Sequence, residues 1–159
     1  IAASINVAIS NLTFGTAVQF DPDQSSIVKR TNSLSYILNP RKFVSMSVSD
    51  NAVKEDDGEK IAKFYGAYPV NESIHLFAGL DRTTSTGVTN SETTGIAYES
   101  CCWAFRIAHF KEKKSSGSGY NYSTGFELVL SGLGSTSTPL KDRIEEKIPD
   151  YSANLRYKP

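Results

Sequence analysis

The chain has 159 residues, the size of one ordinary domain, and its 17 basic and 17 acidic residues cancel. This balance gives no global field that would argue for nucleic acid or an acidic membrane surface as a partner. The sequence contains no apolar run of about 18 residues, which excludes a transmembrane helix. It also lacks a basic start followed by an apolar stretch, so any export signal would lie upstream of this chain.

Apolar residues recur at every second position in segments of about ten residues. The first such segment holds Ile5, Val7 and Ile9, and the stretch 44–49 alternates without a fault. We count about nine of these segments along the chain. The sequence therefore predicts an all-β, antiparallel fold.

The intervening positions are mostly Ser, Thr, Asn, Gly, Ala and Gln, which are small and polar but seldom charged. The outer face of a soluble sandwich normally carries charge, whereas a membrane barrel turns apolar residues to lipid and small polar ones to its lumen. A secreted sandwich with Ser- and Thr-rich faces would produce much of the same pattern. Composition alone leaves both architectures open.

The connections between the predicted strands alternate in length. The short turns are expected at 10–11, 39–42, 69–72 and 100–102, and the longer loops at 21–26, 50–59, 81–91 and 112–122. Outer-membrane barrels show this alternation, with tight periplasmic turns and long outer loops, while a Greek-key sandwich has no reason for it. Single-chain bacterial barrels have even strand numbers, so nine strands indicate part of a larger transmembrane β-barrel, unless one strand is miscounted.

Cys101 and Cys102 are the only cysteines and are adjacent in the sequence. A disulfide between neighbours is strained and rare. The apolar phase changes from even at Tyr98 to odd at Trp103, which predicts a turn at the cysteine pair on the short-turn side. Free thiols do not persist in an oxidising periplasm, so we favour bonds to cysteines outside this chain. Two incidental thiols or a metal site are the alternatives, although no second ligand pair follows.

Two stretches resemble the C-terminal barrel region of LptD, the family of lipopolysaccharide-assembly proteins also called organic solvent tolerance proteins. One is 96–106, which contains a Cys-Cys-aromatic-x-x-Arg motif. The other is 126–134, which looks like the family's final strand and exit, and segment 64–80 adds weaker support. The resemblance spans nearly the whole chain.

The resemblance implies a role in lipopolysaccharide transport without enzymatic activity. Family members form a large outer-membrane barrel with an LptE-like lipoprotein plug and an N-terminal jelly roll, and they depend on the barrel assembly machinery. They receive lipopolysaccharide from a periplasmic bridge and release it through a lateral opening beside the last strand, here Phe126, Leu128 and Leu130. Cys101 and Cys102 match the family pair that forms disulfides with the N-terminal portion.

We divide the chain into barrel strands at 1–134 and a periplasmic tail at 135–159. Within the tail, Thr138 and Pro139 suit a helix start and Pro149 a helix stop. Leu140, Ile144 and Ile148 share one helical face, which predicts a short amphipathic helix against the inner rim of the barrel. A frayed surface helix is the alternative.

No arrangement of residues supports catalysis, a metal or a cofactor. His75 and His109 lie on separate strands, and each is expected to be a lumen or rim residue and not a general base. Asp56-Asp57 and Glu145-Glu146 are best explained as solvated surface, and Gly117-Ser118-Gly119 lacks the strand-to-helix context of a phosphate-binding loop. Lys111, Lys113 and Lys114 are candidate contacts for lipopolysaccharide phosphates, against the alternative of a solvated loop. Two other functions stay open: a generic porin-like outer-membrane barrel segment and a soluble β-sandwich binding module.

Overall fold

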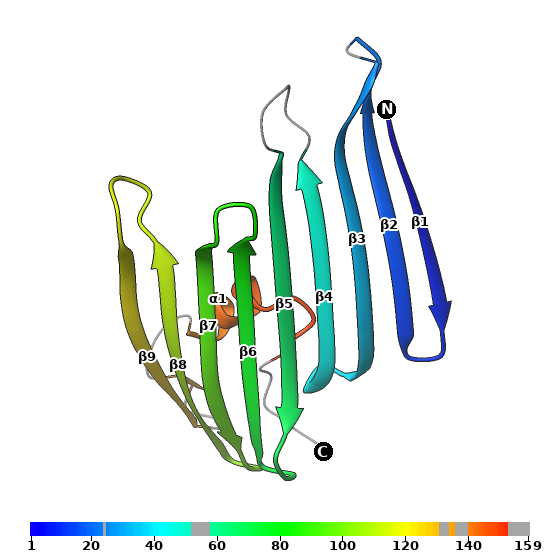
Figure 1. The fold of residues 1–159 in the computed structure, drawn as a ribbon. Helices are drawn as coiled ribbons and strands as arrows, with labels where there is room; N and C mark the ends of the chain where they lie inside the picture. Colours follow the sequence, from blue (N-terminus) through cyan, green and yellow to red (C-terminus); the bar gives the residue numbers. More distant parts are fainter. Residues whose placement is uncertain (24, 52–57, 131–133, 136–139, 153–159) are drawn as a thin grey trace.

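The computed structural model describes residues 1–23, 25–51, 58–130, 134–135 and 140–152. Nine strands of 8 to 14 residues form a single antiparallel sheet in chain order, and the two-residue β10 (Gly134–Ser135) pairs with the last of them (Figure 1). The strands are β1 (Ala2–Ile9), β2 (Leu12–Asp21), β3 (Ser26–Asn39), β4 (Lys42–Asn51), β5 (Glu59–Pro69), β6 (Ile74–Thr83), β7 (Val88–Glu99), β8 (Trp103–Lys113) and β9 (Tyr120–Leu130).

The predicted all-β antiparallel fold with nine main strands is confirmed, together with the short C-terminal helix. The sheet is open among the described residues, because β1 lies at one edge and β9 with the short β10 at the other, and the two edges do not pair with each other (Figure 1). None of the helices in the described residues is long and apolar enough to cross a membrane.

The predicted alternation of loop lengths is wrong at one hairpin. Instead of a long loop over 81–91, β6 runs to Thr83 and β7 starts at Val88, which leaves a connection as short as the one between β5 and β6. Polar side chains extend these strands: the Asn90 amide donates to Asp81 at 2.9 Å and to Thr83 at 3.0 Å beside a bulge after Asp81. Polar composition alone could not distinguish paired strand ends from loop.

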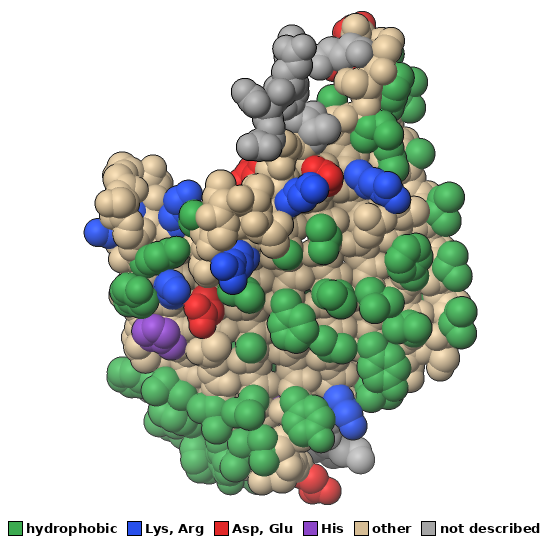
Figure 2. Space-filling view, viewed as in Figure 1, with side chains coloured by type: hydrophobic (Ala, Val, Ile, Leu, Met, Phe, Trp, Pro, Cys, Tyr) green, Lys and Arg blue, Asp and Glu red, His purple; other side chains and the backbone are tan. Residues whose placement is uncertain are grey.

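One face of the sheet, here called the outer face, is covered by exposed apolar side chains (Figure 2). They follow the predicted alternation, and the change of phase at 100–102 is confirmed because Tyr98 is paired with Phe105 across the turn. Representative members from successive strands are Val7, Phe14, Leu34, Val44, Val48, Phe64, Leu76, Ile96, Ile107 and Phe126.

The opposite, inner face is polar only in part. On β3 and β4 it carries hydroxyl pairs such as Ser45 with Ser35 at 2.8 Å and Thr31 with Ser49 at 3.0 Å. From β4 to β8, however, the inner face holds an apolar core of Phe43, Ala67, Phe77, Ala97, Ala108 and Phe110. The expectation of a small polar inner face throughout is therefore wrong in this half, where the C-terminal segment covers the sheet.

Helix α1 (Leu140–Lys147) supplies the other side of this core. Ile144 and Ile148 are 0% exposed, and Ile148 packs over Gly79 of β6. The absence of a side chain at Gly125 leaves room for Leu140, because a Cβ there would lie 2.8 Å from the leucine Cδ1. The packed amphipathic helix agrees with the sequence, although its predicted start at Thr138 and Pro139 lies outside the described residues.

Removing apolar contacts of α1 should release the C-terminal segment. We expect Ile144→Ala to weaken its docking by about 2–4 kcal/mol, because the change empties a fully buried site. Faster proteolysis and faster amide exchange over 140–152 would report the release. Glu146→Ala, on the exposed side of the same helix, is the matched control; equal effects of both changes would contradict this packing.

Candidate functional site at the short-turn end

The cysteine pair forms the turn between β7 and β8 at the short-turn end of the sheet. Cys101 and Cys102 are free thiols, and both are exposed. Ser100 closes the turn: its backbone N–H donates to the Trp103 carbonyl at 2.9 Å, and its Oγ accepts the Trp103 N–H at 3.2 Å. A hydrogen bond with the Cys101 sulfur raises the pKa of the Cys102 thiol. The turn therefore presents both sulfurs away from the sheet.

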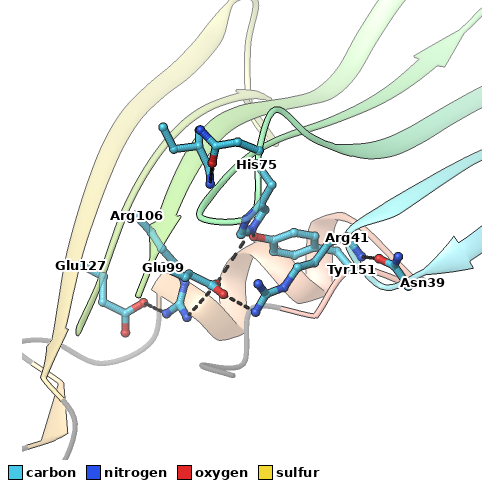
Figure 3. A network of polar contacts seen from close by, with 9 residues as sticks. Asn39, Arg41, His75, Glu99, Arg106, Glu127 and Tyr151 are labelled. Atoms are coloured by element: carbon cyan, nitrogen blue, oxygen red, sulfur yellow. Dashed lines mark hydrogen bonds and ion pairs between the residues drawn. The ribbon is translucent and has the colours of Figure 1, made fainter. Parts of the chain in front are cut away.

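Directly behind this turn, charged side chains from several strands meet on the inner face (Figure 3). Arg41 comes from the turn between β3 and β4, Glu99 from the end of β7, Arg106 from β8 and Glu127 from β9. We call these four residues the charge cluster. The side chains of Glu99 and Arg106 are each 2% exposed, so their charges require partners within the protein.

Glu99 lies at the centre of the charge cluster. It forms an ion pair with Arg41, and its Oε1 lies 3.6 Å from Nη2 of Arg106. Arg106 in turn donates from Nη1 to Oε2 of Glu127 at 2.8 Å. Two guanidinium groups and two carboxylates thus alternate across the ends of four strands. The charges balance, which makes their burial tolerable, and the pairs join the turn between β3 and β4 to β7, β8 and β9.

The C-terminal segment reaches the charge cluster through Tyr151. Its hydroxyl lies 2.6 Å from Nε2 of His75 on β6, and its ring packs 5.0 Å from that of Phe77. Burial raises the pKa of the Tyr151 hydroxyl, and the negative charge of Glu99 adds to the shift, so the group stays protonated. A second anchor lies further along α1, where Arg143 and Lys147 contact Glu112 at 3.3 Å and 2.9 Å. The described segment 140–152 is therefore held at two places.

The other residues selected from the sequence do not converge on this site. The expectation that His109 is a lumen or rim residue is wrong: it lies on the outer face in the middle of β8, with Thr124 at 2.9 Å, away from the cysteine turn. Lys111 pairs with Glu92 at 3.6 Å near the opposite end of the sheet. Asp56-Asp57 falls outside the described residues. Among the residues that the structure describes, no group of His, Cys, Asp and Glu could hold a metal ion.

Sequence reasoning placed the cysteines in their turn but missed the charge cluster. His75 was expected on the inner face or at the rim, which agrees with its position, yet its partner Tyr151 was not foreseen. The available signal was the presence of Glu99, Arg106 and Glu127 at inner-face positions inside strands, where small polar residues are the rule. Ionisable residues at such positions indicate pairing across strands.

These features define an all-β protein: one antiparallel sheet with an apolar outer face, and an inner face closed at one end by a helix and a buried charge cluster. Curated LPS-assembly proteins LptD match it. The protein from Pseudoalteromonas translucida is 26% identical over 76% of this chain, that from Aeromonas salmonicida 27% over 77%, and that from Shewanella sp. strain MR-4 24% over 98%.

The chain is thus related to the LptD family, and the resemblance stated from the motifs is confirmed. It spans only 17%, 16% and 23% of the lengths of these three relatives. No family model matches the chain.

The charge cluster predicts a large cost for removing its central carboxylate. Glu99→Gln keeps the shape of the side chain but leaves Arg41 and Arg106 without the charge that compensates them, and we expect a loss of about 3 kcal/mol in the free energy of unfolding. Urea titration measures this change. Glu72→Gln, on an exposed carboxylate in the neighbouring short turn, should change the value by less than about 0.5 kcal/mol. Equal values for the two variants would contradict the assigned role of Glu99.

Proposed function

We propose that the chain forms the C-terminal strands of an outer-membrane translocon that inserts lipopolysaccharide into the outer leaflet. The relationship to LPS-assembly proteins LptD supports the substrate class. The observation that carries the membrane assignment is the outer face, because every main strand exposes apolar side chains on it. A soluble protein rarely exposes a continuous apolar surface of this extent, which argues against a soluble sandwich module.

The borders of the apolar face have the composition of a membrane interface. Tyr36, Tyr68 and Trp103 border it at the short-turn end, and Tyr120 and Tyr122 lie at the other end of β9. Aromatic girdles of this kind flank the apolar band of outer-membrane barrels. Along β3 the distance from Leu38 to Arg30 is about 26 Å at roughly 3.3 Å per residue, comparable with an apolar band about 25 Å tall.

The last long strand is the proposed border of a lateral opening. β9 pairs with β8 over its whole length but on its other side only with the two residues of β10, among the described residues. Phe126, Leu128 and Leu130 occupy successive outer-face positions on β9, and Phe126 is 69% exposed. An edge with an apolar surface and few backbone pairings suits separation from a neighbouring strand and passage of a lipid chain.

The proposed orientation puts the short turns and the C-terminus in the periplasm. In this arrangement Cys101 and Cys102 form disulfides with cysteines of an N-terminal jelly-roll portion, which the exposure of both thiols favours. An LptE-like plug, the periplasmic lipopolysaccharide-transport bridge and the barrel assembly machinery complete the proposed set of partners. Lys111, Lys113 and Lys114, near the long-loop end of β8, contact lipopolysaccharide phosphates in this proposal.

The membrane assignment predicts opposite tolerance at two adjacent positions of β4. Val48→Arg places a charge on the apolar outer face and should cost about 2–4 kcal/mol near mid-bilayer. Ser47→Arg points to the polar inner face, opposite Ser33 and Lys63, and should cost much less because the Lys63 charge is already paired with Asp81. Unfolding of the parent protein in lipid vesicles measures both losses. Equal costs would argue for a sandwich core in place of a lipid contact.

The cysteine proposal predicts redundant disulfides. In the full-length parent, Cys101→Ser or Cys102→Ser alone should be tolerated, because one bond still holds the barrel to the jelly roll. The double change should impair lipopolysaccharide delivery and sensitise cells to large hydrophobic antibiotics. Non-reducing electrophoresis with peptide mapping identifies the bonds. Two free thiols, or a Cys101–Cys102 crosslink, in the mature protein would contradict the proposal.

A further inference from the structure

Charged side chains on the outer face gather toward the long-loop end of the sheet. Figure 2 shows Lys and Arg side chains at staggered heights in the half of the sheet nearer the long loops, with apolar side chains between and beside them. Basic members come from β3, β5, β6 and β8, and acidic ones from β4 and β7. In strand order the row, here called the outer charged row, contains Arg30, Asp50, Lys60, Arg82, Glu92, Lys111 and Lys113.

Strand register fixes where these residues lie, in steps across the sheet. Arg82 is opposite Ala62, two residues nearer the short-turn end than Lys60, and Glu92 is opposite Leu80, two residues nearer again. Arg30 is directly opposite Asp50, which is directly opposite Lys60 on the next strand. Glu92 is likewise opposite Lys111. Each follows an apolar series at alternate positions of its own strand, so each points to the outer face. The row is therefore built into the sheet, and by register it steps from the level of Lys60 toward the short-turn end at Glu92 and Lys111.

Basic side chains outnumber acidic ones in the outer charged row. Glu92 is neutralised by Lys111 at 3.6 Å, and the Lys111 ammonium also lies 4.6 Å from the centre of the Tyr120 ring. Within the part of the chain that the structure describes, no ion pair involves Arg82 or Lys113, and both side chains are exposed. The row as a whole is positive and directly adjoins a surface suited to acyl chains.

We propose that the outer charged row binds the phosphate groups of phosphorylated glycolipids in the outer leaflet. The arrangement fits such a lipid at two places: its acyl chains contact the apolar face while its phosphates meet Arg30, Lys60 and Arg82. Guanidinium and ammonium groups are the side chains that bind phosphate most strongly. This inference rests on the proposed function, and it adds phosphate contacts on β3, β5 and β6 to the lysines near the end of β8.

The two faces of the same strands supply a matched pair of variants. Arg30 and Lys60 lie on the outer face, whereas Lys29 on β3 and Lys63 on β5 lie on the inner face, Lys63 paired with Asp81 at 3.1 Å. Each double variant removes two positive charges from the same two strands. The intact parent protein, assembled with its natural partners and purified in detergent, is titrated with diphosphorylated lipid A and with the same lipid after dephosphorylation. Native mass spectrometry counts the bound lipids.

We expect Arg30→Ala with Lys60→Ala to weaken binding of the diphosphorylated lipid about tenfold, and adding Arg82→Ala to weaken it further. Lys29→Ala with Lys63→Ala should leave binding within about twofold, because these charges face away from the lipid. The dephosphorylated lipid should bind all forms equally weakly. Equal loss in both double variants, or equal binding of the two lipids by the unchanged protein, would overturn the proposal.

Membrane insertion is measured separately on the same preparations, by fractionation of outer membranes and by the heat-modified mobility of folded barrels. If the unchanged parent protein is absent from the outer membrane, the proposed function itself is wrong. If all variants are inserted and folded but the outer-face double variant binds lipid as the unchanged protein does, only the role of the outer charged row is wrong.

Discussion

The ion pairs of Glu99 are the interaction on which the short-turn end of the molecule depends. The Glu99 carboxylate forms ion pairs with Arg41 and Arg106, which come from different hairpins. Arg106 also forms an ion pair with Glu127. Burying any one of these charges alone would cost desolvation free energy, and the opposite charges of the charge cluster offset that cost. Since Glu99 lies two residues before Cys101, the same pairs that join the strand ends also fix the turn that presents the thiols.

The C-terminal segment converts this end of the sheet into a closed core. Apolar residues of α1 cover Phe77 and Phe110, and Tyr151 extends the contact to His75. The two halves of the inner face thus differ: hydroxyl-bearing side chains line β3 and β4, while β5 to β8 are covered. A segment packed in this way limits the space on the inner face beside the cysteine turn, where we propose that an N-terminal portion attaches.

The outer face obeys a different constraint, since every main strand exposes apolar side chains on it, and aromatic or charged side chains stand toward the ends of several strands. Nothing within the described residues covers it. A lipid bilayer satisfies both features at once, because acyl chains meet the apolar band and head groups meet the borders. The proposed translocon, the lateral opening at β9 and the outer charged row all depend on this division of the outer face.

Much of the fold could be predicted from the sequence, because a strict period of two assigns each side chain to a face without reference to distant residues. The strands, the turn at Cys101 and Cys102, and the face occupied by His75 all follow from local pattern. The extent of β6 and β7 does not follow from local pattern. Asn90, Asp81 and Thr83 are residue types that occur in loops as well as in strands, and only their hydrogen bonds across the hairpin assign them to strands. Only the tertiary structure brought Arg41 to Glu99, Tyr151 to His75, and Arg30 level with Lys60. These partners are far apart in the chain. Whether they meet depends on strand register and on the path of the tail, and no local pattern encodes either.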